Sequence, residues 1–224
     1  MAQQEFDKFA KQYNEVLSAS IPLGMEEDAY FAEYKIALAA QLSAGKKVSR
    51  ILDFGCGAGR SLPYLAKYFP GATLVGFDLS SESLSVAELR EPNVALYSDW
   101  ASLVDMRFDL IFTANVFHHI PVSIRLPALL KCKNILAERG EMIIFEHNPI
   151  NPVTRWIFER CPFDVDAEMI RKEKMLLLSR SAGMRVTETG YTLFFPRQLR
   201  VLRFIERHLS WLPMGAQYYV RLEN

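Results

Sequence analysis

The sequence predicts an α/β fold in which helices cover both faces of a mostly parallel β-sheet. After Lys47, short apolar runs of strand length alternate with helix-compatible segments, a pattern typical of parallel strands joined by right-handed crossovers. Hydrophobic residues make up 50% of the 224-residue chain, which is enough for a large core. No repeat or low-complexity linker divides the chain, so residues 1–224 are expected to form one domain.

The first 45 residues are predicted to be helical. Aromatic and apolar residues recur at helical spacing from Phe6 to Leu17. A second segment, 28–44, is rich in alanine, leucine, tyrosine and glutamate, and Gly45 would end it. These N-terminal helices, 1–45, precede the alternating part of the chain.

The middle of the chain, 46–146, carries the predicted parallel strands. Its apolar runs predict five strands, at 50–54, 73–78, 94–98, 108–115 and 141–146. The segments between them predict helices at 61–69, 82–89 and 123–135, with a short turn near Ala101.

The last part of the chain, 147–224, breaks this rhythm with several prolines. Helices are predicted at 152–160 and 168–181, the second closed by Gly183, and at 197–209. Strands are predicted at 185–195 and 217–222.

The most specific motif lies between the first predicted strand and the helix that follows it. Asp53 ends the strand, and Gly55, Gly57 and Gly59 follow at alternate positions, with Cys56 inside the turn. Glycine accepts positive φ and lets a ligand approach the backbone, so this turn indicates a nucleotide-type binding site. A dinucleotide site would have its third glycine three positions after the second, which argues against a nicotinamide-dependent oxidoreductase.

An acid followed by G-x-G-x-G resembles the first motif of class I S-adenosylmethionine-dependent methyltransferases. The resemblance covers 48–146 and extends to the last two strands. It implies a Rossmann-like sheet of seven strands in the order 3-2-1-4-5-7-6, with strand 7 antiparallel and lid helices at the N-terminus. It also implies that S-adenosylmethionine is the cofactor, and that Asp53 and the glycines hold its methionine end. The helix around Tyr13 resembles a lid whose tyrosine contacts the cofactor carboxylate; the alternative is an ordinary amphipathic helix docked on the sheet.

Two further positions are predicted to bind the cofactor. Asp78 ends the second strand, where an acid can accept both hydroxyls of a ribose; the alternative is a helix N-cap. Leu79 would then lie against the adenine. The resemblance implies that Asp99 bonds the adenine amino group and that Trp100 packs on the ring. A capping aspartate and a core tryptophan explain the same two residues.

Polar residues after the fourth strand are predicted to face the site. In open α/β sheets, ligands bind beyond the carboxyl ends of the strands, so Asn115 to His119 point toward it. Imidazole can take a proton near neutral pH. His118 is similar by position to the basic histidine of plant-type small-molecule O-methyltransferases, although His119 and Ile120 stand where those enzymes have an acid and a tryptophan. The alternative is that His118 only lines the cavity.

The fifth strand ends in a second polar cluster, Glu146, His147 and Asn148. Burial would perturb the pKa of an acid here, which suits proton transfer on the substrate side. The alternative is a polar turn before Pro149. His118, Glu146 and His147 are therefore the three candidate bases.

Composition limits the partners. The formal net charge is zero, so no basic field would attract nucleic acid. The three cysteines have no metal-ligand spacing and no metal site is predicted; they indicate a reducing compartment, and the protein is expected to be cytoplasmic. No signal peptide and no run of ~20 apolar residues is evident. The sequence carries no signal for an oligomeric state.

The predicted function is transfer of the methyl group of S-adenosylmethionine to a hydroxyl or amine of a small molecule. A protein or RNA methyltransferase of the same fold and a non-catalytic cofactor-binding protein stay as alternatives. The stretch after Glu146 and the end of the chain resemble poorly characterised bacterial methyltransferases that accompany sugar or lipid pathways. Arginines at 197, 200, 203 and 207 form a stripe that could bind an anionic acceptor or an anionic membrane surface, or could simply be solvated.

Overall fold

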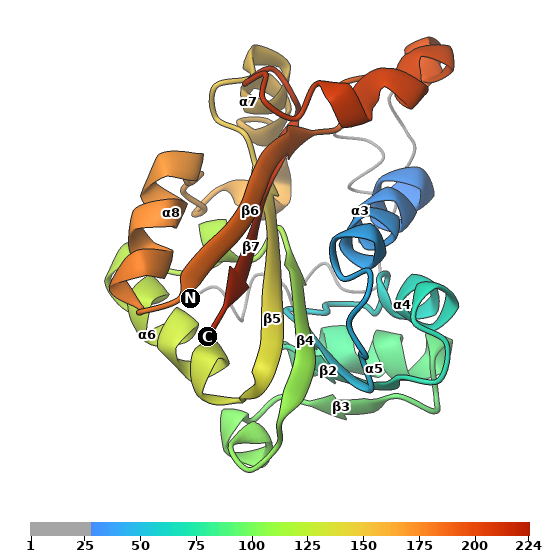
Figure 1. The fold of residues 1–224 in the computed structure, drawn as a ribbon, viewed down its shortest axis with the longest axis vertical. Coiled ribbons are helices and arrows are strands. Elements are labelled where there is room, and N and C mark those ends of the chain that lie inside the picture. Colours follow the sequence, from blue (N-terminus) through green and yellow to red (C-terminus); the bar gives the residue numbers. More distant parts are fainter. Residues whose placement is uncertain (1–27) are drawn as a thin grey trace.

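The computed structural model describes residues 28–224, so the predicted helix around Tyr13 lies outside the described residues. Figure 1 shows one sheet with helices on both sides. The helices are α3 (Asp28–Leu42), α4 (Leu62–Tyr68), α5 (Ser81–Arg90), α6 (Val122–Asn134), α7 (Pro152–Phe158) and α8 (Lys172–Ser181). The strands are β1 (Arg50–Phe54), β2 (Thr73–Phe77), β3 (Ala95–Tyr97), β4 (Phe108–Ala114), β5 (Leu136–His147), β6 (Arg185–Thr192) and β7 (Gln217–Glu223). Four 3₁₀ segments complete the described part of the chain: η1 (Trp100–Leu103), η2 (Phe117–His119), η3 (Pro162–Asp164) and η4 (Arg197–His208).

The predicted strand order is confirmed. The sheet runs β3-β2-β1-β4-β5-β7-β6. Strands β1 to β5 pair in parallel, and β7 pairs antiparallel with both β5 and β6. The carboxyl ends of the parallel strands and the first residue of β7 therefore meet at one edge, because an antiparallel strand begins where its neighbours end.

Two apolar cores lie on the two faces of the sheet, because alternate residues of a strand point to opposite faces. On β1, Ile51 packs with α3 and α4, whereas Leu52 packs in the other core, to which α6 and α8 contribute. On β4, Phe112 packs in the same core as Ile51, and Ile111 packs in the same core as Leu52. Figure 1 shows α3 and α4 on one side of the sheet and α6 and α8 on the other.

Three elements differ most from the sequence prediction, and the bounds of the others shift by at most three residues. Strand β5 begins at Leu136 rather than at Glu141, through an irregular stretch in which Leu136 pairs with Phe108. Helix α8 begins only at Lys172. The predicted helix 197–209 is a 3₁₀ segment with a kink at Leu199, whose side chain is exposed rather than part of an apolar face. A 3₁₀ helix has three residues per turn, so the α-helical wheel places its side chains wrongly.

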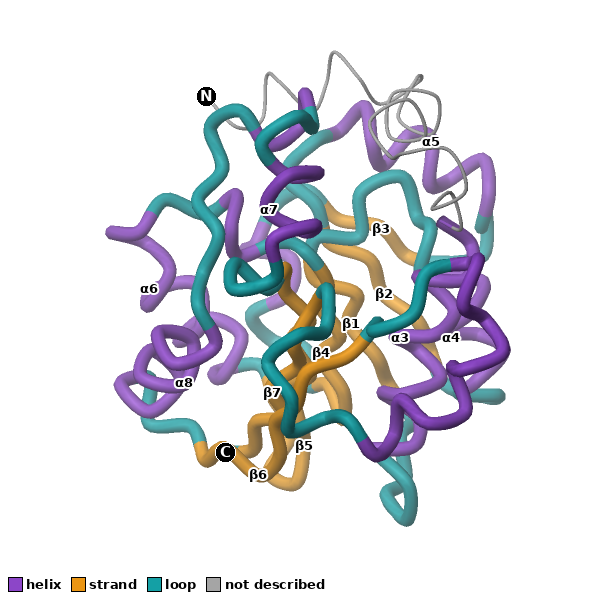
Figure 2. The backbone as a smooth tube through the Cα atoms, turned by 90° about the horizontal axis from the view of Figure 1, so that it is seen from above, coloured by secondary structure: helices purple, strands orange, loops and turns teal. Residues whose placement is uncertain are grey.

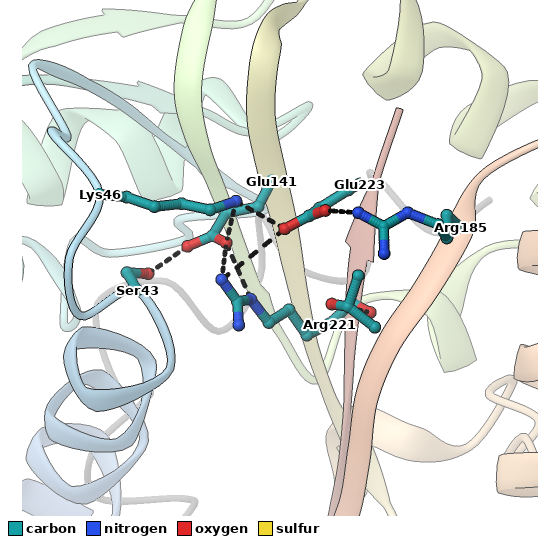
Figure 3. Close-up of polar contacts among 7 residues, drawn as sticks. Ser43, Lys46, Glu141, Arg185, Arg221 and Glu223 are labelled. Atoms are coloured by element: carbon teal, nitrogen blue, oxygen red, sulfur yellow. Dashed lines mark hydrogen bonds and ion pairs between the residues drawn. The ribbon is translucent and has the colours of Figure 1, made fainter.

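A buried carboxylate on β5 forms the centre of a polar network at the opposite edge of the sheet (Figure 3). The network joins Ser43, Lys46, Glu141, Arg185, Arg221 and Glu223. Glu141 is fully buried and accepts from Arg221 Nε (2.8 Å) and Nη2 (2.6 Å), while Lys46 Nζ lies 2.8 Å from it. These bonds tie the connection between α3 and β1 to β5, β6 and β7, away from the strand ends that carry the predicted site residues.

Candidate functional site

A cavity of about 560 Å³ lies at the carboxyl ends of the parallel strands. Loops and α7 lie across these strand ends in the view from above (Figure 2). Eight predicted site residues line the cavity: Gly55, Cys56, Gly57, Asp78, Leu79, Asn115, His118 and His147. Its volume is in the range of small-molecule and cofactor sites.

The glycine loop is shaped by left-handed backbone. The backbone N–H groups of Gly55 and Cys56 both donate to Phe77 O at the end of β2 (2.7 and 3.0 Å). A Cβ on Gly55 would overlap the Val116 side chain, whereas a Cβ on Gly57 would have no atom within 4 Å. Gly57 has φ +50 and lines the cavity, so its backbone is open to a ligand. The loop fits a ligand that contacts main chain, as the predicted cofactor would.

Gly59 packs against a helix and does not line the cavity. It is not among the cavity-lining residues, and a Cβ there would lie 2.9 Å from Ala87 Cβ on α5. The absence of a side chain at Gly59 therefore allows the loop to pack closely on α5.

Asp78 lines the cavity and is held in place by two amides. Gly57 N–H donates to Oδ2 (2.8 Å), and Ser80 N–H donates to Oδ1 (2.9 Å). The N-cap of α5 is Ser80, whose hydroxyl oxygen accepts from Ser83 N–H (3.1 Å). Ser80 therefore has the N-cap role that was the alternative for Asp78. Leu79 lines the cavity with 58% of its surface exposed.

Asp53 is buried behind the loop. Its exposure is 2%, it is not among the cavity-lining residues, and its Oδ2 has no hydrogen-bond partner within the described part of the chain. Burial and the carboxylate of Asp78 raise the pKa of Asp53 to about 8, while Lys35 on α3 opposes this rise. An unsatisfied buried carboxyl oxygen beside the glycine loop fits a cationic ligand group such as an ammonium.

Asp99 and Trp100 lie outside the cavity lining. Asp99 caps η1 by accepting from Ala101 N–H (3.0 Å). The Trp100 ring packs edge-on against Phe77 (5.3 Å between ring centroids) and Phe54 (6.0 Å). Capping and core packing account for these contacts, and their adenine contacts stay a prediction.

His118 sits between two carboxylates. Its Nδ1 lies 2.6 Å from Glu146 Oε2, and because a carboxylate can only accept, Nδ1 donates. Its Nε2 lies 3.4 Å from Asp164 Oδ1. Burial alone would lower the pKa of His118, but Glu146 and Asp164 outweigh it and raise the pKa above its ordinary value. The two carboxylates therefore favour the charged form of His118.

Glu146 is fully buried and is not among the cavity-lining residues. Hydrogen bonds hold its carboxylate in one position. Its Oε1 accepts from the backbone N–H groups of Val116 (3.0 Å) and Phe117 (2.7 Å). Burial would raise the pKa of Glu146, yet His118 holds it below its ordinary value. Its contacts position η2 and the His118 ring.

Two further imidazoles line the cavity. The ring centroids of His119 and His147 lie 4.1 and 5.1 Å from that of His118. Burial, followed by the charge of His118, lowers the pKa of His119 to about 3 and that of His147 to about 4. Both are therefore neutral at pH 7. Asp164 on η3 was not among the predicted site residues, because it carries no local motif and lies far along the chain from His118 and His119.

Gln217 is a second residue that the sequence analysis did not single out. It opens β7, lines the cavity, and donates from Nε2 to Asn115 Oδ1 (3.1 Å). Its Oε1 is buried without a hydrogen-bond partner among the described residues. Asn115 has φ +60, a conformation in which asparagine is enriched. The sequence did carry a signal for Gln217: it is a polar residue at the start of the strand that was predicted to be antiparallel.

Arg200, Arg203 and Arg207 of the predicted arginine stripe are not among the cavity-lining residues. Arg200 and Arg207 are exposed, whereas the Arg203 guanidinium stacks 3.5 Å over the Tyr30 ring of α3 and donates to Phe195 O (3.2 Å). Among the described residues, the lysine and arginine side chains in the lining are those of Lys35 and Arg60. Within residues 28–224, no helix is both long and apolar enough to cross a membrane.

Comparison with known proteins supports the sequence resemblance. Residues 51–140 match the family described as "Methyltransferase domain". The uncharacterized methyltransferase YrrT of Halobacillus halophilus is 26% identical over 63% of this chain and 64% of its own length, so the chain spans less than two thirds of that relative.

Solved structures share the fold. A methyltransferase of Thermotoga maritima, titled as S-adenosylmethionine-dependent and a possible histamine N-methyltransferase, superposes with a TM-score of 0.68 at 18% identity over 99% of both chains. The plantazolicin methyltransferase BpumL in complex with S-adenosylhomocysteine has a TM-score of 0.61 at 17% identity, over 100% of this chain and 99% of its own. The predicted fold and the predicted resemblance to S-adenosylmethionine-dependent methyltransferases are confirmed.

Proposed function

We propose that this chain, which carries a methyltransferase domain over residues 51–140, transfers the methyl group of S-adenosylmethionine to a hydroxyl or amine of a small molecule. One observation carries the proposal. A single cavity is lined by Gly57 and Asp78 beyond β1 and β2 and by an imidazole cluster beyond β4 and β5. The proposed cofactor site and the proposed proton-accepting site thus share one cavity.

The proposed cofactor residues act by position and charge. S-adenosylmethionine supplies the reactive methyl group when bound, so the protein contributes chiefly orientation. Gly55 and Gly57 give close access to main chain, and Asp78 offers a carboxylate to the ribose hydroxyls. Asp53 provides negative charge toward the amino group once it ionises. Tyr13, Cys56, Leu79, Asp99, Trp100 and Asn115 are proposed as secondary contacts.

Among the three predicted bases, His147 fits best. His118 lies between the carboxylates of Glu146 and Asp164, which favour its charged form, and Glu146 is buried outside the cavity lining. His147 lines the cavity, and its lowered pKa keeps it neutral. We assign His147 to accept the proton of a hydroxyl acceptor, and His118 with Glu146 to hold the polar side of the site. An amine acceptor that binds in its neutral form needs no base at the methyl-transfer step.

The acceptor is proposed to have an apolar body. Apolar side chains line much of the cavity: Phe31, Val153, Ile157, Phe158, Leu193, Phe194 and Phe195. An anionic group on the acceptor would find Lys35 and Arg60 in the lining, rather than the exterior arginines of η4. The neutral net charge of the chain disfavours RNA as acceptor.

A labelling experiment tests the proposal. The protein is incubated with S-adenosylmethionine labelled in its methyl group and with separate small-molecule, RNA and protein fractions of a cell extract. Label in the small-molecule fraction is expected, with Asp78→Ala lowering it through cofactor affinity and His147→Ala lowering it with S-adenosylhomocysteine affinity unchanged. Label confined to RNA or protein would contradict the acceptor class. Tight cofactor binding without label in any fraction would favour a non-catalytic cofactor-binding protein.

A further inference from the structure

Three side chains converge on one point of the cavity wall. Asp164 Oδ1 lies 3.4 Å from His118 Nε2 and 3.4 Å from His119 Nε2, and one ligand atom from each residue lies within 4.8 Å of the others. The histidines come from η2 after β4, and the carboxylate comes from η3 after α7. All three residues line the cavity.

We propose that His118, His119 and Asp164 bind one divalent transition-metal ion at this point, and that His118 Nε2 releases its proton to solvent as the ion binds. Two ligand atoms bound ~2.1 Å from Zn²⁺ at a tetrahedral angle are about 3.4 Å apart. The same separation is longer than most N–H···O hydrogen bonds, which fall at ~2.7–3.2 Å. The spacing around Asp164 Oδ1 therefore suits a shared ion better than a pair of hydrogen bonds.

Glu146 gives His118 the orientation of a metal ligand. A metal-binding histidine commonly donates its other ring N–H to a carboxylate, which fixes the tautomer and turns the free nitrogen toward the ion. His118 Nδ1 is paired with Glu146 Oε2 at 2.6 Å, so Nε2 is the nitrogen directed toward Asp164. Glu146 is itself held by the amides of Val116 and Phe117.

The two loops that carry the ligands are fastened together. Glu168 N–H donates to His118 O (2.9 Å), and the Arg125 guanidinium donates to both Ile120 O (2.8 Å) and Glu168 O (2.9 Å). Asp164 N–H donates to Cys161 O (3.1 Å), which steadies η3. The ligand geometry is thus set by main-chain contacts that do not depend on an ion.

A site with three protein ligands leaves a position toward the cavity. Two histidines and one carboxylate with open positions are typical of catalytic Zn²⁺ and non-haem Fe²⁺ centres. An acceptor oxygen bound there would be acidified by the ion, and this consequence rests on the proposed methyl transfer. Metal binding itself does not depend on that function.

Metal titration tests the inference. Tag-free protein is stripped with a chelator and titrated with Co²⁺ by absorption spectroscopy and with Zn²⁺ by calorimetry. One ion per chain is expected, with His119→Ala and Asp164→Asn each weakening binding at least about tenfold and Glu146→Gln weakening it about 10- to 100-fold. His208→Ala, which removes an exposed histidine on η4, is the matched control and should bind like wild type.

Affinity for S-adenosylhomocysteine and thermal unfolding, measured on each variant, show that it is folded. An absent one-to-one event, or equal metal affinity in wild type, His119→Ala and Asp164→Asn, would overturn the site and leave His118 as an ion-paired imidazolium. Because no methyl transfer is measured, failure of the metal site and failure of the proposed function are distinguishable.

Discussion

Replacing Gly57 with alanine tests whether a ligand approaches the glycine loop. Gly57 has φ +50, and a Cβ there would have no protein atom within 4 Å. The only cost to folding is the left-handed backbone, about 1–2 kcal/mol for an L-residue. For a chain of this size that corresponds to a fall in Tm of about 2–8 °C.

The effect on binding should be separate and larger. The new methyl group would stand in the cavity, on the surface that the proposed cofactor contacts. Overpacking of this kind costs about 1–3 kcal/mol. Calorimetry with S-adenosylhomocysteine should therefore show binding weakened by about 5- to 150-fold.

Gly71→Ala is the matched control. Gly71 has φ +84, also has open space around a Cβ, and does not line the cavity. Its Tm should fall by a similar amount while affinity for S-adenosylhomocysteine stays at the wild-type value. If Gly57→Ala binds as tightly as Gly71→Ala, no ligand lies against the loop and the cofactor placement is wrong.

Three other perturbations give separate tests. Asp78→Ala should weaken S-adenosylhomocysteine at least about tenfold in calorimetry, since each hydrogen bond to a charged group contributes about 1.5–3 kcal/mol; unchanged affinity would remove the ribose role. Asp53 has its pKa raised to about 8 in the fold against about 3.9 when unfolded, so the folded state holds an extra proton between these values and loses stability as pH rises. Asparagine does not titrate, so the unfolding free energy of Asp53→Asn relative to that of wild type should be higher at pH 8 than at pH 5 in urea unfolding. A difference between the two proteins that is the same at both pH values would contradict this. Glu141→Ala strands Arg221 in a largely buried network and should cost about 3–5 kcal/mol of unfolding free energy with cofactor affinity intact; a loss under about 1 kcal/mol would show that the network contributes little.

The sequence was sufficient to predict the order of the strands and the bounds of β1, because these signals are local. β1 is an apolar run ended by Asp53 and glycine, and its predicted bounds, 50–54, are those observed. The position of Asp78 follows from a similar local signal, because it directly follows β2, the strand next to β1 in the sheet. Parallel order then brings the two strand ends together.

The remaining site features depend on distant contacts that leave no local pattern. Asp164 reaches His118 only through the fastening of η3 to η2, and Gln217 reaches Asn115 only because β7 is antiparallel. The charge state of His118 depends on two carboxylates from other elements. The 3₁₀ geometry of η4 was also missed, because a pattern of apolar spacings does not distinguish three residues per turn from 3.6.

The antiparallel strand β7 has a consequence for the order of folding. The hydrogen bond from Gln217 to Asn115 spans 102 positions of the chain, whereas neighbouring strands such as β1 and β2 are joined by a short crossover. Closing a long loop costs chain entropy before any contact is gained, so contacts of high sequence separation form late. The half of the sheet that holds the glycine loop can therefore assemble while the opposite wall of the cavity is still missing. The cavity wall opposite the glycine loop therefore carries a larger chain-entropy cost than the strands that hold the loop.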